Sequence, residues 1–157
     1  MDAITMLTEQ HSKLRTLFSA FDGASTSAER TAVFEDIQDE LSVHTTLEEK
    51  VFYPAAYAGE PQHVLASALE DHRALKRALV ELMDMNVGTE RFQEKLWALR
   101  EQVEAHVTEE EEVLFPRARA RLGAPALREL WVKMEVLFTR EALHGPTRNL
   151  VEQVQAY

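Results

Sequence analysis

Cysteine is absent from the 157-residue sequence, and this absence limits the sites that the protein can build. Disulfide bonds, iron–sulfur clusters and zinc–thiolate sites all need thiol groups. A bound metal ion would therefore take nitrogen ligands from histidine and oxygen ligands from carboxylates. Six histidines and 27 acidic residues are available for that purpose.

Basic residues are few relative to acidic ones. The 17 lysines and arginines leave a net charge of −10 at pH 7, and no basic cluster offsets it. Nucleic acids and anionic membrane surfaces repel such a chain, so we expect neither as a partner. The sequence also lacks a signal-peptide pattern and any apolar run long enough to span a bilayer. These features favour a cytoplasmic protein, with a monomer and a homodimer both open.

Glycine and proline are also rare, with five of each, and they stand where helical periodicity stops. Between them, apolar residues recur at every third or fourth position, as in amphipathic helices. The sequence therefore predicts an all-α protein. Its first four helices are one from Ile4 to Phe21 that ends before Gly23, one from Ile37 to Val51 that runs into Pro54, one after Pro61 that stops near Gly88, and one from near Thr89 to Val113 that ends before Pro116.

Short connections between these helices predict an antiparallel up-and-down four-helix bundle, which we place at residues 3–116. A chain of this length is expected to bury one hydrophobic core. We therefore expect a single domain over residues 1–157.

A C-terminal helical extension, residues 125–157, is expected after a break at Gly123 and Pro125. It can cover one side of the bundle or form a dimer surface. The large side chains of Trp131 and Phe138 favour the cover, because both need burial.

A segment of the second helix recurs in the fourth helix. Residues 44–54 read HTTLEEKVFYP, and residues 106–116 read HVTEEEEVLFP. Side chains four positions apart lie about one turn apart on the same face of a helix. Each segment therefore directs an imidazole and a carboxylate to one side: His44 with Glu48, and His106 with Glu110.

Two further histidines, His11 and His72, fall within the apolar stripes of the first and third helices. The residues four positions after these histidines are also alike, because Arg15 follows His11 and Lys76 follows His72. Each half of the chain is thus a helical hairpin with the same polar insertions. In a pseudo-twofold bundle the two halves would face each other.

Burial of these polar residues without partners would cost several kcal/mol for each of them. A domain is stable by only about 5–15 kcal/mol, so something must compensate the cost. Ion pairs between histidine and glutamate are one alternative, but a bound cation compensates better. Imidazole with carboxylate suits iron, manganese or zinc, whereas magnesium and calcium prefer oxygen ligands alone.

The pattern of His, His-x-x-x-Glu, His, His-x-x-x-Glu resembles the hemerythrin-like proteins of the His-His-Glu cation-binding type. The resemblance covers roughly Ala3 to Pro116. It implies a non-haem di-iron centre with bridging glutamates, terminal histidines and further oxygen ligands from water, hydroxide or oxide. Manganese or zinc is also possible at the six residues that it implies as metal ligands: His11, His44, Glu48, His72, His106 and Glu110.

The sequence departs from the oxygen-carrying hemerythrins at several positions. The carriers have a second histidine on the third helix, where this chain has Lys76, and the equivalent place on the first helix holds Arg15. We expect Lys76 to pair with an acidic residue, for which Glu49, Glu111 and Glu112 are candidates, since a protonated amine does not bind iron. Reversible oxygen transport is therefore not favoured.

The fourth helix leaves two candidate carboxylates. The carriers use the carboxylate five places after the histidine, which is Glu111 here, whereas symmetry with Glu48 favours Glu110. Under the second choice Glu49 and Glu111 lie outside the ligand set.

Three other residues are expected to lie outside the centre. His63 and His144 stand at helix ends, where surface or capping roles are typical. Tyr53 follows His44 by nine positions, which places it on the opposite side of an ideal helix. Only a distortion at Pro54 would bring its phenol inward, as a ligand or a redox-active group.

The resemblance implies a protein that reacts with a small oxidant, namely O2, H2O2 or NO, and peroxide breakdown fits the departures from the carriers. Whether the protein is an enzyme is left open. Iron or oxygen sensing, iron storage without turnover and a structural zinc or manganese site are the alternatives.

Overall fold

The computed structural model describes residues 1–156, and all regular structure in this range is helical. The prediction of an all-α fold is therefore confirmed. None of these helices is long and apolar enough to cross a membrane. In chain order, the elements are α1 (Ala3–Gly23), α2 (Ser27–Leu47), the π-helix η1 (Glu48–Phe52), α3 (Tyr53–Ala56), α4 (Gln62–Met83), α5 (Glu90–Glu109), the π-helix η2 (Glu110–Leu114), α6 (Phe115–His144) and α7 (Leu150–Gln155).

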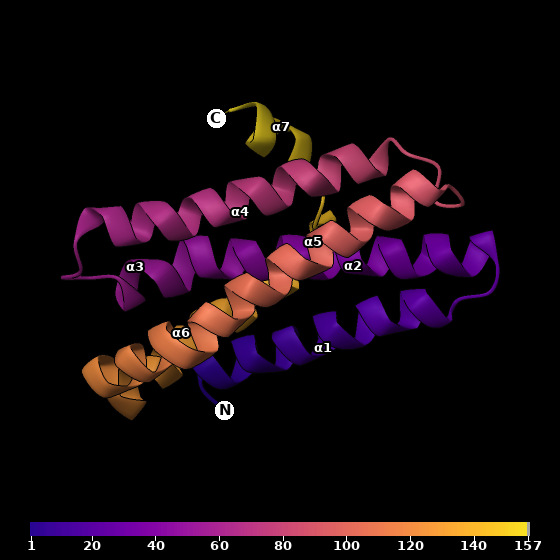
Figure 1. The fold of residues 1–157 in the computed structure, drawn as a ribbon. Coiled ribbons are helices and arrows are strands. Elements are labelled where there is room, and N and C mark those ends of the chain that lie inside the picture. The colour runs from indigo at the N-terminus through magenta and orange to yellow at the C-terminus, as the bar shows by residue number, and fades with distance from the viewer. Residues whose placement is uncertain (157) are drawn as a thin grey trace.

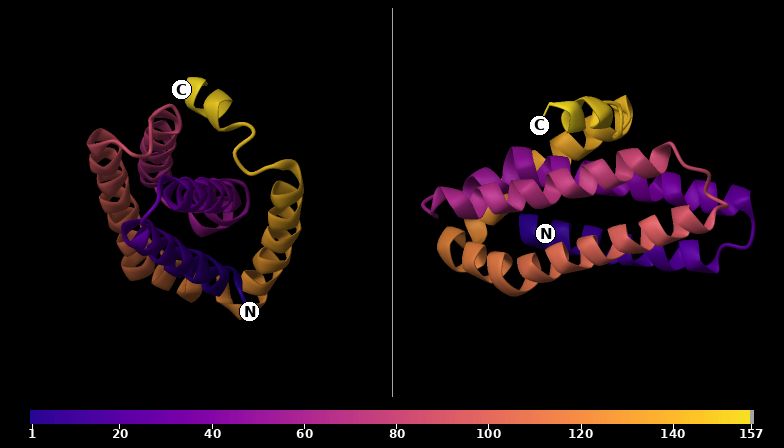
Figure 2. Two further views of the ribbon diagram at one scale, coloured as in Figure 1. Left: turned by 90° about the vertical axis from the view of Figure 1, so that its right-hand side faces the viewer. Right: turned by 45° about the horizontal axis from the view of Figure 1, so that its top comes forward.

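Helices α1, α2, α4 and α5 lie side by side and alternate in direction (Figures 1 and 2). Side chains with an oxygen acceptor begin three of them, because the first backbone N–H groups of a helix have no partner within it. Asp2 accepts a hydrogen bond from the Thr5 amide at 2.9 Å. Thr26 and Thr89 act in the same way at the starts of α2 and α5. The helix start expected near Thr89 is thus confirmed.

Two apolar clusters make up the core, and a polar layer separates them. Along α1, one cluster includes residues up to Leu7 and the other begins at Leu14, with Gln10 and His11 between them. Helix α4 changes cluster around His72, and α2 changes just before His44. The buried apolar residues of α5 all belong to the second cluster, and the first cluster resumes after His106, at Leu114 in η2. Helical periodicity thus brings the polar insertions of all four helices to one level.

The helices of the two repeated segments do not end at their prolines, and this corrects the sequence prediction. A π-helical turn follows α2 and another follows α5, after which Pro54 and Pro116 stand in the first turns of α3 and α6. Proline lacks an N–H group, but the first turn of a helix does not need that donor. The chain therefore continues as a helix through both prolines.

The expected break after the bundle is present as a bend inside α6. Gly123 has φ 77° and ψ 167°, a conformation that residues with a side chain rarely adopt. Beyond it, α6 packs across α1 and α2, and α7 returns beside α4 (Figure 2). Trp131 and Phe138 are half-buried against the core cluster, so this part of the chain covers the bundle. Tyr157, at the end of the expected extension, lies outside the described residues.

Candidate metal centre

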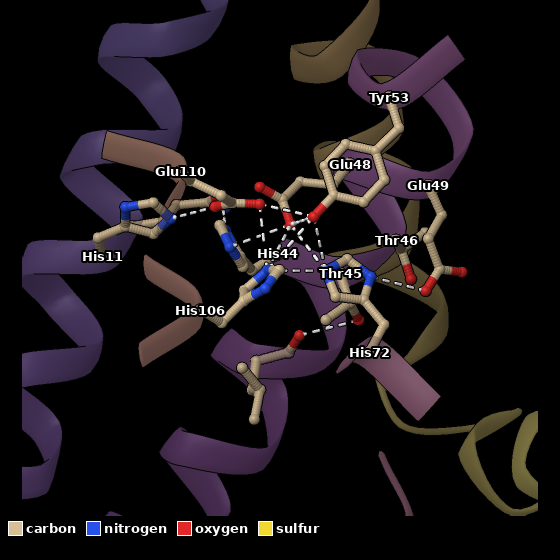
Figure 3. A network of polar contacts seen from close by, with 12 residues as sticks. His11, His44, Thr45, Thr46, Glu48, Glu49, Tyr53, His72, His106 and Glu110 are labelled. Carbon is tan, nitrogen blue, oxygen red and sulfur yellow. Dashed lines mark hydrogen bonds and ion pairs between the residues drawn. The ribbon is translucent and has the colours of Figure 1, made fainter. Parts of the chain in front are cut away.

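The six predicted ligand residues meet in the polar layer between the two apolar clusters (Figure 3). They form two groups of four residues, and both groups contain Glu48 and Glu110. Within each group the candidate ligand atoms lie within 4.8 Å of one another. The first group adds His11 and His44, and the second adds His72 and His106.

Each glutamate reaches a histidine of its own half and a histidine of the other half. Glu48 Oε2 lies 3.3 Å from His44 Nε2 and 3.0 Å from His72 Nε2. Glu110 places Oε1 3.1 Å from His106 Nε2 and Oε2 3.2 Å from His11 Nε2. Both carboxylates therefore stand between the two groups, where a carboxylate can bridge two metal ions.

The donor atoms of this layer are compatible with a cation. All six side chains are buried, and four have an inward-facing nitrogen or oxygen without a hydrogen-bond partner among the described residues. Buried polar atoms without a hydrogen bond are costly unless something else satisfies them. The four atoms are His11 Nε2, His44 Nε2, Glu48 Oε1 and Glu110 Oε2.

Burial and neighbouring charges set the protonation of the layer. Burial lowers the pKa of His44 to about 4, so its imidazole is neutral at pH 7. Burial acts to raise the pKa of Glu48, but the histidines around it outweigh this and hold the pKa well below its usual range. Burial and neighbouring Glu48 also act to raise the pKa of Glu110, yet its histidine partners lower it. Both glutamates are therefore ionised.

The other three histidines behave differently from His44. Burial acts to lower the pKa of His11, His72 and His106, but their carboxylate partners outweigh burial and raise it. Metal ions bind the neutral imidazole, so binding has to displace protons from these rings.

Two carboxylates outside the layer hold histidines of the opposite half. Glu49 Oε1 lies 2.9 Å from His72 Nδ1 and accepts a hydrogen bond from Lys76 Nζ at 2.7 Å. Glu111 Oε1 lies 2.9 Å from His11 Nδ1 and also contacts Arg15. Of the three acidic residues expected as candidate partners of Lys76, Glu49 is the one that it contacts. Such outer partners fix the orientation of an imidazole.

The remaining two histidines have outer partners that sequence reasoning missed. Gln10 Oε1 lies 3.0 Å from His44 Nδ1, and Asp71 Oδ2 lies 3.7 Å from His106 Nδ1. All four imidazoles thus direct Nε2 inward and Nδ1 outward. Gln10 and Asp71 immediately precede histidines of the layer, and that repeated position is the signal that would have identified them.

A family model described as the hemerythrin HHE cation binding domain matches residues 2–134. The chain belongs to this family. The crystal structure of a hemerythrin HHE cation binding domain-containing protein from Mycobacterium kansasii superposes with a TM-score of 0.80 and 24% sequence identity. The match covers 100% of this chain and 99% of that chain, and it shows the shared fold.

A curated relative from Nostoc sp. (strain PCC 7120 / SAG 25.82 / UTEX 2576), named DNA nickase, is 24% identical to this hemerythrin-like chain over 114 residues. The aligned segment covers 73% of this chain but only 32% of the relative. This chain therefore corresponds to about a third of that protein.

Tyr53 lies at the centre and not on the far side of the helix, where an ideal helix would have placed it. It is 1% exposed, and its hydroxyl donates to Glu110 Oε1 at 2.6 Å. The same hydroxyl lies 3.0 Å from His72 Nε2 and 3.3 Å from His106 Nε2. The distortion responsible is η1, which precedes Pro54: a π-turn pairs residues five apart, and Tyr53 is five residues after Glu48.

His63 and His144 lie outside the centre of this hemerythrin-like fold, as expected. Both are exposed, His63 in the first turn of α4 and His144 in the last turn of α6. Neither belongs to the two groups of candidate ligands. The structure also places Glu110 inside the layer and Glu111 outside it, against His11.

Proposed function

We propose that the protein binds two iron ions in this layer and that the loaded centre reacts with a small oxidant, such as O2, H2O2 or NO. The proposal rests on the two groups of four residues that share Glu48 and Glu110. Two shared carboxylates could bridge a pair of metal ions. The histidines supply the nitrogen ligands of a set that suits iron, manganese or zinc.

Iron would supply the change of oxidation state that reaction with an oxidant needs and that zinc does not provide. The protein's contribution is to hold the imidazoles in fixed directions and to limit access of water. An aromatic ring packs on one histidine of each group: Phe115 stacks on His11 with centroids 5.6 Å apart, and Tyr53 stacks on His72 at 5.1 Å.

We include peroxide breakdown in the proposal because the ligand set is small. Lys76 and Arg15 stand one turn after His72 and His11, and both form ion pairs with outer carboxylates. Neither cation is available to bind metal. Coordination positions that the protein does not fill are open to a small molecule.

Anaerobic loading with Fe²⁺, followed by addition of H2O2, tests the proposal. Metal analysis after desalting should find two iron ions per chain, and the loaded protein should consume peroxide over many turnovers. His106→Ala should lose bound iron and the peroxide activity. His63→Ala is the matched control, because this histidine is exposed and outside the layer.

The outcomes distinguish the alternatives. A protein that binds iron but turns over no oxidant would act as a sensor or a store. Selective retention of zinc or manganese over iron would indicate a structural site. Iron binding by the His106→Ala variant equal to that of the unmodified protein would contradict the centre itself.

A further inference from the structure

A groove with a volume of about 140 Å³ opens beside α4 and η2 and reaches the centre. His106 and Glu110 line its inner end, while Ser67, Ala68 and Asp71 of α4 line one wall. A neighbouring hollow of about 240 Å³ between α4 and α5 also touches Asp71 and His106. Both openings therefore meet at the second group of candidate ligands.

Exposure of the histidines agrees with this opening. His106 is 8% exposed, whereas His11, His44 and His72 are 0–1% exposed. Phe115 lies parallel to the His11 ring, with 7° between the two planes, and covers that side. The layer is thus closed around the first group and open at His106.

The lining of the groove is acidic. Glu60, Asp71 and Glu109 contribute three carboxylates, of which Glu60 also pairs with Arg121. Arg117 and His106 are the basic residues among the lining side chains. The buried carboxylate of Glu110 lies at the inner end, 2% exposed. A narrow passage with this charge attracts cations and repels anions.

Comparison of the two halves singles out Asp71. It is the counterpart of Gln10, since each residue precedes a histidine and faces Nδ1 of another. Gln10 is 6% exposed and neutral, while the side chain of Asp71 is 58% exposed and carries charge. A carboxylate therefore replaces the amide on the side where the layer opens.

We propose that this groove is the entrance through which divalent cations reach the centre, and that the carboxylate of Asp71 receives them at its mouth. This inference rests on the proposed binding of metal. It adds a route and a positioning residue, Asp71, to the candidate ligands.

Rates of Fe²⁺ loading under anaerobic conditions test the entrance, with rapid desalting and metal analysis at successive times. Asp71→Asn keeps an oxygen acceptor for His106 but removes the charge. Loading should slow roughly 3–10-fold at low ionic strength, and the difference should vanish at high salt. Asp84→Asn, directly after the end of the same helix and roughly 20 Å away along its axis, makes the same charge change and should load like the unmodified protein.

Larger side chains in the wall test the groove itself. Ala68→Leu should slow both iron loading and iron removal by a chelator, with the final iron content unchanged. Because Ala68 is buried, Ser67→Trp provides a second variant at an exposed position of the same wall. It should slow both rates without affecting folding.

The results separate a failure of the proposed entrance from a failure of the proposed metal centre. Loading of all these variants at the rate of the unmodified protein would overturn the entrance while leaving the metal centre intact. A loss of final iron content in Ser67→Trp or Asp71→Asn, with unchanged rates, would also overturn it. Absence of iron binding in the unmodified protein would instead overturn the proposed function.

Discussion

Each imidazole of the centre contacts an inner glutamate through Nε2 and an outer oxygen atom near Nδ1. The outer contacts explain the two basic residues, Lys76 and Arg15, that stand one turn after His72 and His11. Lys76 and Arg15 bind the carboxylates that orient His72 and His11. They act on the centre through those histidines. Removal of such an outer partner is expected to weaken metal binding without removing a ligand.

Tyr53→Phe tests the role of the Tyr53 hydroxyl, whose position could not be predicted from the sequence. Its hydroxyl donates to the ionised Glu110, and a hydrogen bond to a charged group contributes about 1.5–3 kcal/mol. The variant should lower the free energy of unfolding of the chelator-treated protein by that amount, measured by urea denaturation. Tyr57→Phe is the control, since its hydroxyl has no hydrogen-bond partner in residues 1–156. Equal losses in the two variants would contradict the assigned role.

Spacing placed four histidines, and the glutamates one turn after two of them, in phase with the core, and the resemblance to hemerythrin-like proteins implied that these six residues are metal ligands. Spacing along one helix could not place Tyr53 or assign a role to Gln10 and Asp71, although the shared position of the last two before a histidine marks them in the sequence. The position of Tyr53 depends on a π-turn, and the roles of Gln10 and Asp71 depend on contacts between different helices.

At the scale of elements, the two π-helices begin at the two shared glutamates. Glu48 opens η1 and Glu110 opens η2, and an aromatic residue follows each π-turn directly. The turns thereby direct Tyr53 towards the layer and Phe115 onto His11. Their occurrence at both functional segments agrees with the usual placement of π-turns at functional sites.

Gly123→Ala tests the bend by which α6 comes to cover the bundle. The backbone of Gly123 lies in a region that only glycine adopts readily, so the substitution should cost about 1–3 kcal/mol in unfolding free energy. A Cβ at this position would meet only Pro125, at 3.9 Å, so the cost would come from the backbone. Gly23→Ala, at a glycine without positive φ, should cost less than the first variant in the same denaturation experiment.

On the scale of the whole molecule, the polar layer joins helices from both halves of the chain across its core. Metal ions bound to the two groups would together link α1, α2, α4 and α5, which contribute no other buried histidines among the described residues. Binding to the folded state alone stabilises it by mass action. The candidate centre is thus also a stability element.

Thermal unfolding should report this link. Free Fe²⁺ at 100 times its dissociation constant should add about 2.7 kcal/mol of stability for each of the two sites, and a chelator should reverse the effect. His106→Ala should abolish the stabilisation, while His144→Ala, at an exposed helix end, should retain it. A similar increase in all three proteins would indicate binding elsewhere.

The sequence by itself determined the helical class, the repeated halves and the four histidines in phase with the core, because each follows from periodicity within one segment. The tertiary structure decided which carboxylate faces inward, where Tyr53 lies and which side of the layer is open. These features depend on how helices distant in sequence pack together. The π-turns are the clearest case, since the segments around Pro54 and Pro116 were expected to end their helices and instead continue as helices past them.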